Sequence, residues 1–502
     1  MVLNGVLVCS ASQALGSQPA FARTVAADDA SKRVLAVKTL QQILPTPEQL
    51  PLIQNTRPGV VLIRGAAGSG KTTTALLRLR QLAAFWLNRR VRLAQSNPVR
   101  ILVATYNRTL RGYIADLAAS QVQARTDLEL TVSTFAKWAQ SMLPGVSVLD
   151  ADVTKARLVS LGATVPLPGD FLIDEVEYLL GRFLPTKIGD YLTCFRDGRG
   201  ASPRVDRALR KRILDDVVTP YVAWKAKNNR LDWNDVCVRL LDVTNHQDYD
   251  VIIADEVQDF SANQVRALMH FAADPSSVTF VLDAAQRIYP RGFSWREAGV
   301  VVNPAESYRL SKNYRNTKQI CQFALPLIQG MEIGDDGTFP DFNSCQSSGP
   351  LPVVVKGLYS KQVEFALDQL GKIDLSQESV AFLKPRGGHW FDYLRTQLAA
   401  SSYDYVELTR QSDWPRTGGN IALSTMYSAK GLEFDHVFIL GLNEEVTPHG
   451  ADPDDTSAVT LRRLLAMAIT RARNTVTIGY KPEEASRLIG LLDPCTYRKV
   501  KL

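Results

Sequence analysis

The chain has 502 residues, of which 45% are hydrophobic and 22% are charged. This length predicts roughly two to four domains, and the composition is that of a globular protein rather than a disordered or fibrous one. The formal net charge of +7 is a weak indication of a polyanionic partner.

Cysteine usage and hydropathy exclude further classes. The six cysteines are scattered, without a CxxC pair or a cysteine–histidine cluster at metal spacing, which indicates reduced thiols. No apolar run approaches the ~18 residues of a membrane span. No Lys or Arg precedes Arg23, so the start of the chain lacks the basic region of a secretory signal. We therefore expect a cytoplasmic protein with no membrane partner.

Short apolar runs of strand character recur along the chain, with helical patterns between them. They lie at 60–64, 101–105, 251–254, 278–283, 353–355, 380–383, 421–425, 436–441 and 475–480. Strands that alternate with amphipathic helices predict an α/β fold with parallel sheets. The runs form two groups, and few lie between residues 111 and 245, where the pattern is helical. The predicted divisions are an N-terminal extension (1–40), a first α/β domain (41–110 and 246–300), a helical accessory insertion (111–245) and a second α/β domain (301–502).

The most informative segment follows the first apolar run and has the pattern GxxxxGK[ST]. A strand, this loop and a helix form a phosphate-binding unit, because glycines let backbone amides face phosphate oxygens and the helix start adds a positive dipole end. Lys71 is placed to reach the β- and γ-phosphates, and the Thr72 hydroxyl to ligate Mg²⁺. The residues expected to bind the nucleotide here are Gly65, Ala66, Ala67, Gly68, Ser69, Gly70, Lys71, Thr72 and Thr73.

An acidic pair, Asp255 and Glu256, follows the apolar run 251–254. Carboxylates at the end of a buried strand are costly unless positive charge lies beside them, and Mg²⁺ on a bound nucleotide supplies that charge. We expect Asp255 to hold the metal and Glu256 to orient and deprotonate the attacking water. The alternative is a pair of ordinary acidic loop residues.

A basic stretch lies inside the predicted helical insertion. From Arg196 to Arg230 there are ten Lys or Arg residues against four Asp. Such a run is either a solvated helix face or part of a nucleic-acid-binding surface.

Further short motifs are ordered along the chain between residues 46 and 480. Asp255–Asp259 reads Asp-Glu-Val-Gln-Asp, and the others are Thr46–Gln49, Ala104–Leu110, Val132–Trp138, Leu282–Tyr289, Asn313–Thr317, Ser424–Phe434 and Ala468–Ala472. Asp255–Asp259 resembles the DExQD motif of superfamily 1 DNA helicases of the UvrD/Rep/PcrA type. The others, in the order in which they are named, resemble the glutamine, Ia, Ib, III, IV, V and VI motifs of that family. The resemblance implies two RecA-like domains with ATP in the cleft between them.

The resemblance also implies roles for residues around the nucleotide. Gln49 would contact the adenine and Tyr314 would stack on it. Gln286 would sense the γ-phosphate, and Glu433 would lie near the ribose.

Two arginines would reach the same phosphate from the second domain. By analogy with the family, Arg315 and Arg471 act as arginine fingers. Guanidinium groups that neutralise charge on a transferred phosphoryl group accelerate the reaction by ~10³–10⁵-fold in well-studied cases. Because these residues belong to a separate domain, hydrolysis would require domain closure.

Single-stranded nucleic acid is bound by polar groups along its backbone and by aromatic side chains that stack on bases. Trp295 is the leading candidate for stacking, and the alternative is a tryptophan of the core. The candidate contacts are Thr105, Tyr106, Asn107, Arg108, Thr134, Phe135 and Trp295, with Thr425, Tyr427 and Ser428 on the second domain.

The sequence departs from the family pattern in several places. Tyr427 stands where histidine is common, Ala466 replaces an aromatic residue, and Trp295 lies later than the tryptophan expected after motif III. Only 109 residues separate Arg315 of motif IV from Thr425 of motif V, so this is a short form without the large insertion of full-length relatives.

Two functions are consistent with these features. The first is an ATP-dependent helicase or translocase that moves 3′→5′ on single-stranded DNA and unwinds duplex. The second is a nucleic-acid-sensing ATPase subunit that regulates an effector or nuclease protein, as in bacterial antiviral systems of the Gabija type. Both use ATP and Mg²⁺.

Overall fold

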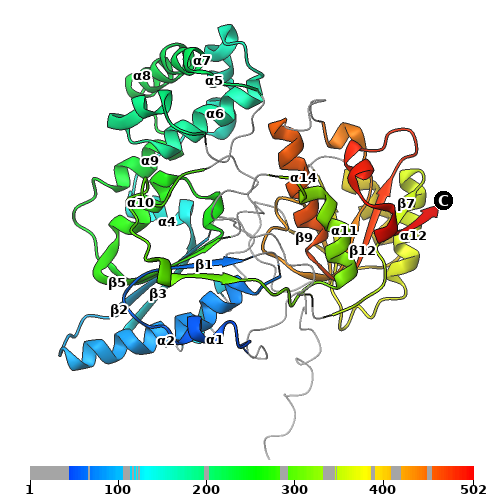
Figure 1. Cartoon of the computed structure of the whole chain (residues 1–502), viewed down its shortest axis with the longest axis horizontal. Helices are drawn as coiled ribbons and strands as arrows, with labels where there is room; N and C mark the ends of the chain where they lie inside the picture. Colours follow the sequence, from blue (N-terminus) through cyan, green and yellow to red (C-terminus); the bar gives the residue numbers. More distant parts are fainter. Residues whose placement is uncertain are drawn as a thin grey trace, which may run out of the picture.

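The computed structural model describes most of the chain. The described residues are 45–65, 68–105, 114–115, 118–119, 121–122, 125–196, 203–282, 292–331, 345, 347–385, 390–408, 420–448 and 455–502. The predicted N-terminal extension, residues 1–40, lies outside them. Figure 1 shows two sheet-containing domains side by side, with a group of helices above the first.

The first sheet has six parallel strands in the order β3-β2-β4-β5-β1-β6. Ile252 packs into one hydrophobic cluster, whereas its neighbours Val251 and Ile253 pack into another, because successive strand residues point to opposite faces. Both faces are therefore buried. The strands are β1 (Gly59–Gly65), β2 (Val99–Thr105), β3 (Leu128–Thr134), β4 (Tyr249–Asp255), β5 (Ala272–Leu282) and β6 (Ser307–Leu310).

Helices cover the two faces of this sheet. One face packs against α2 (Lys71–Arg92), which buries Leu79 and Trp86, and α1 (Leu50–Gln54) contacts α2. The cluster on the other face includes residues of α4 (Phe135–Met142), α9 (Trp233–Leu240) and α10 (Ala262–His270).

A helical unit with its own hydrophobic core is inserted between β3 and β4 (Figure 1). It comprises α5 (Ala151–Leu161), α6 (Gly169–Arg182), α7 (Arg207–Arg212), a π-helical turn (Ile213–Val218) and α8 (Thr219–Lys227). Part of the basic stretch stabilises this unit. Arg196 forms two hydrogen bonds of 2.7 and 2.8 Å with the buried Glu175, and Lys225 is 3% exposed and bonds to Asp232 at 2.7 Å.

The second sheet has seven parallel strands in the order β13-β7-β12-β11-β8-β10-β9. Helices α11 (Lys318–Ile328) and α14 (Thr456–Ile469) contribute to a cluster on one face. Helices α12 (Tyr359–Leu370) and α13 (Trp390–Ala400) pack on the other. The strands are β7 (Val353–Lys356), β8 (Val380–Lys384), β9 (Tyr405–Leu408), β10 (Ile421–Thr425), β11 (Phe434–Ile439), β12 (Ala472–Tyr480) and β13 (Arg498–Lys501).

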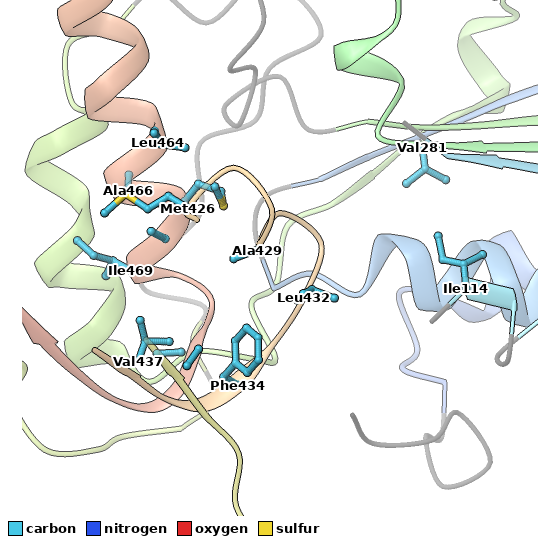
Figure 2. Packing of buried hydrophobic residues seen from close by; sticks show 14 of the residues in the cluster. Ile114, Val281, Met426, Ala429, Leu432, Phe434, Val437, Leu464, Ala466 and Ile469 are labelled. Atoms are coloured by element: carbon cyan, nitrogen blue, oxygen red, sulfur yellow. The ribbon is translucent and has the colours of Figure 1, made fainter. Parts of the chain in front are cut away.

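The turn between β10 and β11 is anchored in the core of the second domain. Met426, Ala429 and Leu432 belong to the same buried cluster as residues of α14 (Figure 2). They are 1%, 0% and 2% exposed, respectively. The position of this turn is therefore set by packing as well as by its own hydrogen bonds.

The predicted fold class, two parallel α/β domains with a helical insertion, is confirmed. Two predicted boundaries were wrong. Strand β3 comes from the predicted insertion (111–245) and β6 from the predicted second domain (301–502), yet both pair in the first sheet. Within the described part of the chain, no helix is long and apolar enough to cross a bilayer.

Candidate active site

The phosphate-binding loop joins the end of β1 to the start of α2. Gly68 and Gly70 adopt positive φ angles of 78° and 75°, which favour glycine. A Cβ atom at Gly68 would lie 2.3 Å from Asn313 Oδ1, and one at Gly70 would lie 2.7 Å from Gln49 Nε2. The predicted Gln49 thus packs against this loop, and its Nε2 donates to the Ser69 carbonyl at 3.4 Å. Glycine is required at both positions by conformation and by space.

The predicted metal-binding pair is brought together at the carboxyl end of the sheet. The Thr72 hydroxyl donates to Asp255 Oδ2 at 2.8 Å, and Asp255 is 3% exposed. Burial, with the neighbouring negative charge of Glu256, raises the pKa of Asp255 to about 7. A hydroxyl beside a buried carboxylate that needs a positive charge to stay ionised fits Mg²⁺. This hard cation binds few protein oxygens and completes its shell with phosphates and water.

Glu256 lies next to this pair in a strained conformation. Its φ of 58° places a non-glycine residue in the left-handed region, and such strain is concentrated at functional sites. Burial opposes ionisation of its carboxyl, but the positive charges of Lys430, Lys71 and Arg471 outweigh burial and lower its pKa. The Gln258 amide also donates to its Oε2. Glu256 is therefore ionised at neutral pH, as a general base must be.

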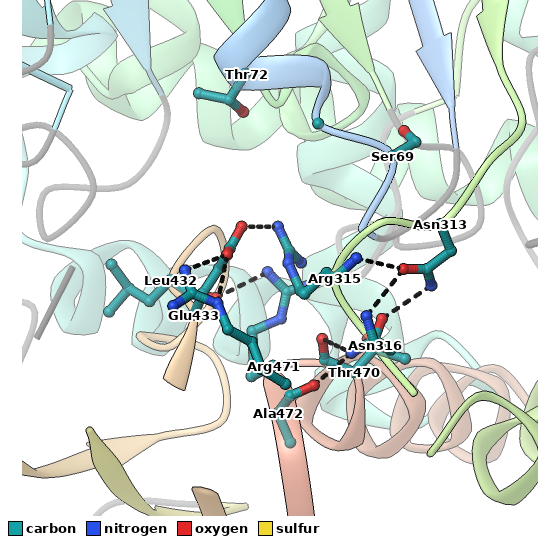
Figure 3. Close-up of polar contacts among 12 residues, drawn as sticks. Ser69, Thr72, Asn313, Arg315, Asn316, Leu432, Glu433, Thr470, Arg471 and Ala472 are labelled. Atoms are coloured by element: carbon teal, nitrogen blue, oxygen red, sulfur yellow. Dashed lines mark hydrogen bonds and ion pairs between the residues drawn. The ribbon is translucent and has the colours of Figure 1, made fainter. Parts of the chain in front are cut away.

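Charged residues of the second domain face the phosphate-binding loop (Figure 3). Arg315 pairs with Glu433, which also accepts from Arg473 at 2.8 Å. Arg471 is 2% exposed and donates to the carbonyls of Met467 at 3.1 Å and Leu432 at 3.3 Å. Its charge, with those of Lys430 and Lys71, lowers the pKa of Glu256 in the first domain.

Motif IV holds Tyr314 and Arg315 beside the loop. The Tyr314 amide donates to the Gly68 carbonyl at 3.0 Å, and its side chain is 38% exposed, as a ring that stacks on a base requires. Asn313 Oδ1 accepts from the Arg315 amide at 2.9 Å, which orients that segment. Asn316 joins it to motif VI through a 3.0 Å bond to the Thr470 carbonyl. The sequence analysis gave neither asparagine a role, although both lie in the motif Asn-Tyr-Arg-Asn.

Lys430 is a further residue that the sequence analysis did not single out. It comes from the turn after β10, yet its Nζ lies 2.5 Å from Asp259 Oδ2 and 3.5 Å from Glu256 Oε2 in the first domain. Motif V includes this lysine, but nothing in the sequence pattern shows that its partners lie in the acidic motif Asp255–Asp259.

Three predicted nucleic-acid contacts on the first domain are buried in the structure. Phe135 is 2% exposed and packs against Trp138 and Phe260, so its ring is part of the core. Thr105 is 0% exposed at the end of β2 and pairs in register with Asp255. Thr134 is 4% exposed, and its hydroxyl caps α4 by accepting from the Lys137 amide at 3.2 Å.

The remaining candidates differ in accessibility. Trp295 is half-buried and stacks on Phe280 with ring centroids 5.2 Å apart, so at most one face could receive a base. Thr425 and Ser428 bond to each other at 3.0 Å within the turn, and Tyr427 is partly buried beside them. The other predicted residues lie outside the described residues, namely Ala66, Ala67, Tyr106, Asn107, Arg108 and Gln286.

A separate hollow of about 540 Å³ lies at the opposite edge of the first sheet. It is lined by residues at the amino ends of β2, β4 and β5. Arg90 pairs there with Asp250 at 2.7 Å, and Arg100 with Glu129 at 2.9 Å. Both of these ion pairs are formed within its lining, which includes no described residue of the phosphate-binding loop.

Comparison with known families agrees with this geometry. Residues 49–291 match the model of an AAA domain, which spans the phosphate-binding loop and the acidic motif. Residues 394–483 match the UvrD-like helicase C-terminal domain, which spans motifs V and VI. The chain is homologous to UvrD-like DNA helicases. The first matched region carries the phosphate-binding loop and the acidic motif, the second carries Lys430, Glu433 and Arg471, and motif IV lies between the two regions.

Individual UvrD-like relatives are distant. The chain is 22% identical over 448 residues to a probable DNA helicase of Mycoplasma pneumoniae, a match that covers 83% of this chain and 79% of the relative. It is 40% identical over 78 residues to the ATP-dependent DNA helicase PcrA of Staphylococcus aureus, which covers 15% of this chain and 11% of PcrA.

A solved structure also matches part of the chain. The C-terminal domain of a possible DNA helicase from Lactobacillus plantarum WCFS1 is 22% identical, and the match covers 37% of this chain and 98% of that one. Its TM-score of 0.28 is too low to support a shared fold.

Proposed function

We propose that this protein hydrolyses ATP with Mg²⁺ to move 3′→5′ along single-stranded DNA and to unwind duplex. The observation that carries the proposal is the position of Glu256. Its carboxylate lies 3.5 Å from Lys430 Nζ of the other domain, and it follows Asp255, which bonds to Thr72 of the phosphate-binding loop. Residues needed for phosphate binding, water activation and charge stabilisation thus converge at one junction from two domains that can separate.

The proposed roles follow from this geometry. Lys71 and the loop amides bind the phosphates, and Thr72 and Asp255 hold Mg²⁺, which neutralises phosphate charge when bound. Glu256 takes a proton from the attacking water. Arg315 and Arg471 stabilise negative charge on the transferred phosphoryl group. Gln49 and Tyr314 are the proposed adenine contacts.

Arg315 must exchange partners for this to happen. It pairs with Glu433 in the structure, and Arg473 would keep Glu433 paired when Arg315 turns to phosphate. Domain closure around the nucleotide would thus be coupled to hydrolysis, and repeated cycles would move the domains along a strand. The helical unit α5–α8 is the proposed accessory subdomain.

A regulatory ATPase subunit is the second proposal. It is favoured by the burial of Phe135 and Thr105 and by the structural ion pairs that occupy part of the basic stretch. These features reduce the number of predicted strand contacts on the first domain. In this function the same junction would respond to nucleic acid and to a protein partner, such as a nuclease, without processive movement.

Stimulation by DNA distinguishes the two proposals. Single-stranded oligo(dT) is expected to raise the steady-state rate of ATP hydrolysis by about tenfold or more, because strand binding favours the closed arrangement. The apparent affinity for oligo(dT) should fall at least about tenfold between 50 and 200 mM salt, since phosphate contacts release counterions. The measurement is ATPase rate against oligo(dT) concentration at several salt concentrations.

Unwinding of a duplex with a 3′ single-stranded tail, but not one with a 5′ tail, would support the proposed polarity. An ATPase rate that no nucleic acid changes would contradict the motor and favour the partner-regulated subunit. The control is ATP hydrolysis by Glu256→Gln, which should stay at background with and without DNA.

A further inference from the structure

An ion pair between the two domains is buried at the junction. Lys430 belongs to the second domain, and Asp259 follows β4 of the first. Their charged atoms are 2.5 Å apart, and the residues are 3% and 1% exposed. The same ammonium group lies 3.5 Å from Glu256 Oε2. A single side chain of the second domain thus touches both the first domain's acidic motif and its proposed general base.

This contact depends on how the domains are arranged. A buried lysine and aspartate are stable only as a pair, because either charge left alone in the interior carries a large desolvation penalty. When the domains separate, water can hydrate both groups and the contact is lost. The pair therefore forms only in the arrangement in which the second domain lies against the acidic motif.

The position of Lys430 is tied to a compact turn. The Ala429 amide donates to the Thr425 carbonyl at 3.0 Å, and the Lys430 amide to the Tyr427 carbonyl at 3.4 Å. Ala429 and Leu432 anchor the turn in the core on either side of Lys430 (Figure 2). The proposed DNA contacts Thr425 and Tyr427 lie on this same turn, so a DNA strand bound there would help to hold Lys430 in its position.

We propose that Lys430 is a positioning residue that latches the second domain onto Asp259 and holds the Glu256 carboxylate in its working geometry when a strand occupies the turn. This proposal depends on the proposed ATP hydrolysis. It adds a way in which DNA binding would affect the position of the general base Glu256. Lys430 does not itself contact the reacting atoms in this proposal. Its loss should therefore reduce turnover more than ATP binding.

The test compares Lys430→Met with Lys430→Arg and with Lys372→Met, a control at an exposed lysine of the second domain. In the presence of oligo(dT), Lys430→Met should lower kcat by about tenfold or more and change the KM for ATP by less than about threefold. Lys430→Arg, which keeps the charge, should recover part of the loss. Lys372→Met should match the unmodified protein.

A second variant, Asp259→Asn, removes the partner charge in the first domain. It keeps the test informative if Lys430→Met fails to fold. It should reproduce the loss in kcat, and the double variant with Lys430→Met should be no worse than about the larger single effect, because the two residues act as a pair. Additive losses would overturn the latch, as would an unchanged DNA-stimulated kcat in Lys430→Met. If the unmodified protein fails to hydrolyse ATP, the proposed function falls as well.

Discussion

Glu256→Gln is expected to bind ATP and to be nearly unable to hydrolyse it. Glutamine keeps the size of the side chain and cannot accept a proton from the attacking water, so kcat should fall by about 10²–10⁴-fold. ATP affinity should change little, because Lys71 and the loop amides remain in place. Steady-state hydrolysis and equilibrium binding of a fluorescent ATP analogue measure the two quantities separately.

Two comparisons make this result specific. Lys71→Ala should show the opposite pattern, with weakened ATP binding, because the phosphates lose a point charge. Glu364→Gln removes a carboxylate from an exposed pair on α12 and should leave both quantities unchanged. Hydrolysis at the normal rate by Glu256→Gln would reject its assignment as the general base.

The sequence predicted the interior strands of both sheets and missed the edge strands. The four missed strands are β3 and β6 in the first sheet and β9 and β13 in the second, each at an edge in the strand order. Interior strands such as β4 are buried along their whole length and read as continuous apolar runs. Edge strands are partly exposed and polar, as in Arg-Lys-Val-Lys of β13, so they leave no apolar run to detect.

At the site, contacts within the first domain were easier to predict than contacts between the two domains. Thr72 and Asp255 lie together as expected, because the carboxyl ends of parallel strands share one edge of the sheet. The Lys430–Asp259 pair joins residues 171 positions apart in different domains, and no local pattern encodes it. The burial of Phe135 could not be foreseen, because an aromatic residue after a strand has the same sequence appearance whether it packs inward or faces solvent.

The Arg471 side chain links the fold of the second domain to the chemistry of the first. Its backbone carbonyl accepts from the Phe434 amide at 2.9 Å, and its guanidinium donates to the Leu432 carbonyl, so it is held against the turn that carries Lys430 and Glu433. A change in the conformation of that turn would therefore move Arg471 and Lys430 together.

Arg471→Ala and Arg315→Ala are each expected to reduce kcat by about 10³-fold or more, with nearly unchanged ATP affinity, because each guanidinium acts mainly on charge that develops in the transition state. The combined variant should lose far less than the product of the single losses if both arginines serve one phosphoryl group. Single-turnover hydrolysis and binding of a non-hydrolysable ATP analogue provide the measurements.

Arg487→Ala is the matched control, since Arg487 forms an exposed ion pair with Glu444 at 3.2 Å, and such pairs contribute only ~0–1 kcal/mol. It should retain full activity. A structure with a bound ATP analogue should show Arg315 released from Glu433 and both finger guanidinium groups at hydrogen-bonding distance from the γ-phosphate. If Arg471 instead stayed on the Leu432 carbonyl in that closed state and its alanine variant hydrolysed ATP normally, it would be a structural arginine, and hydrolysis would depend on Arg315 alone.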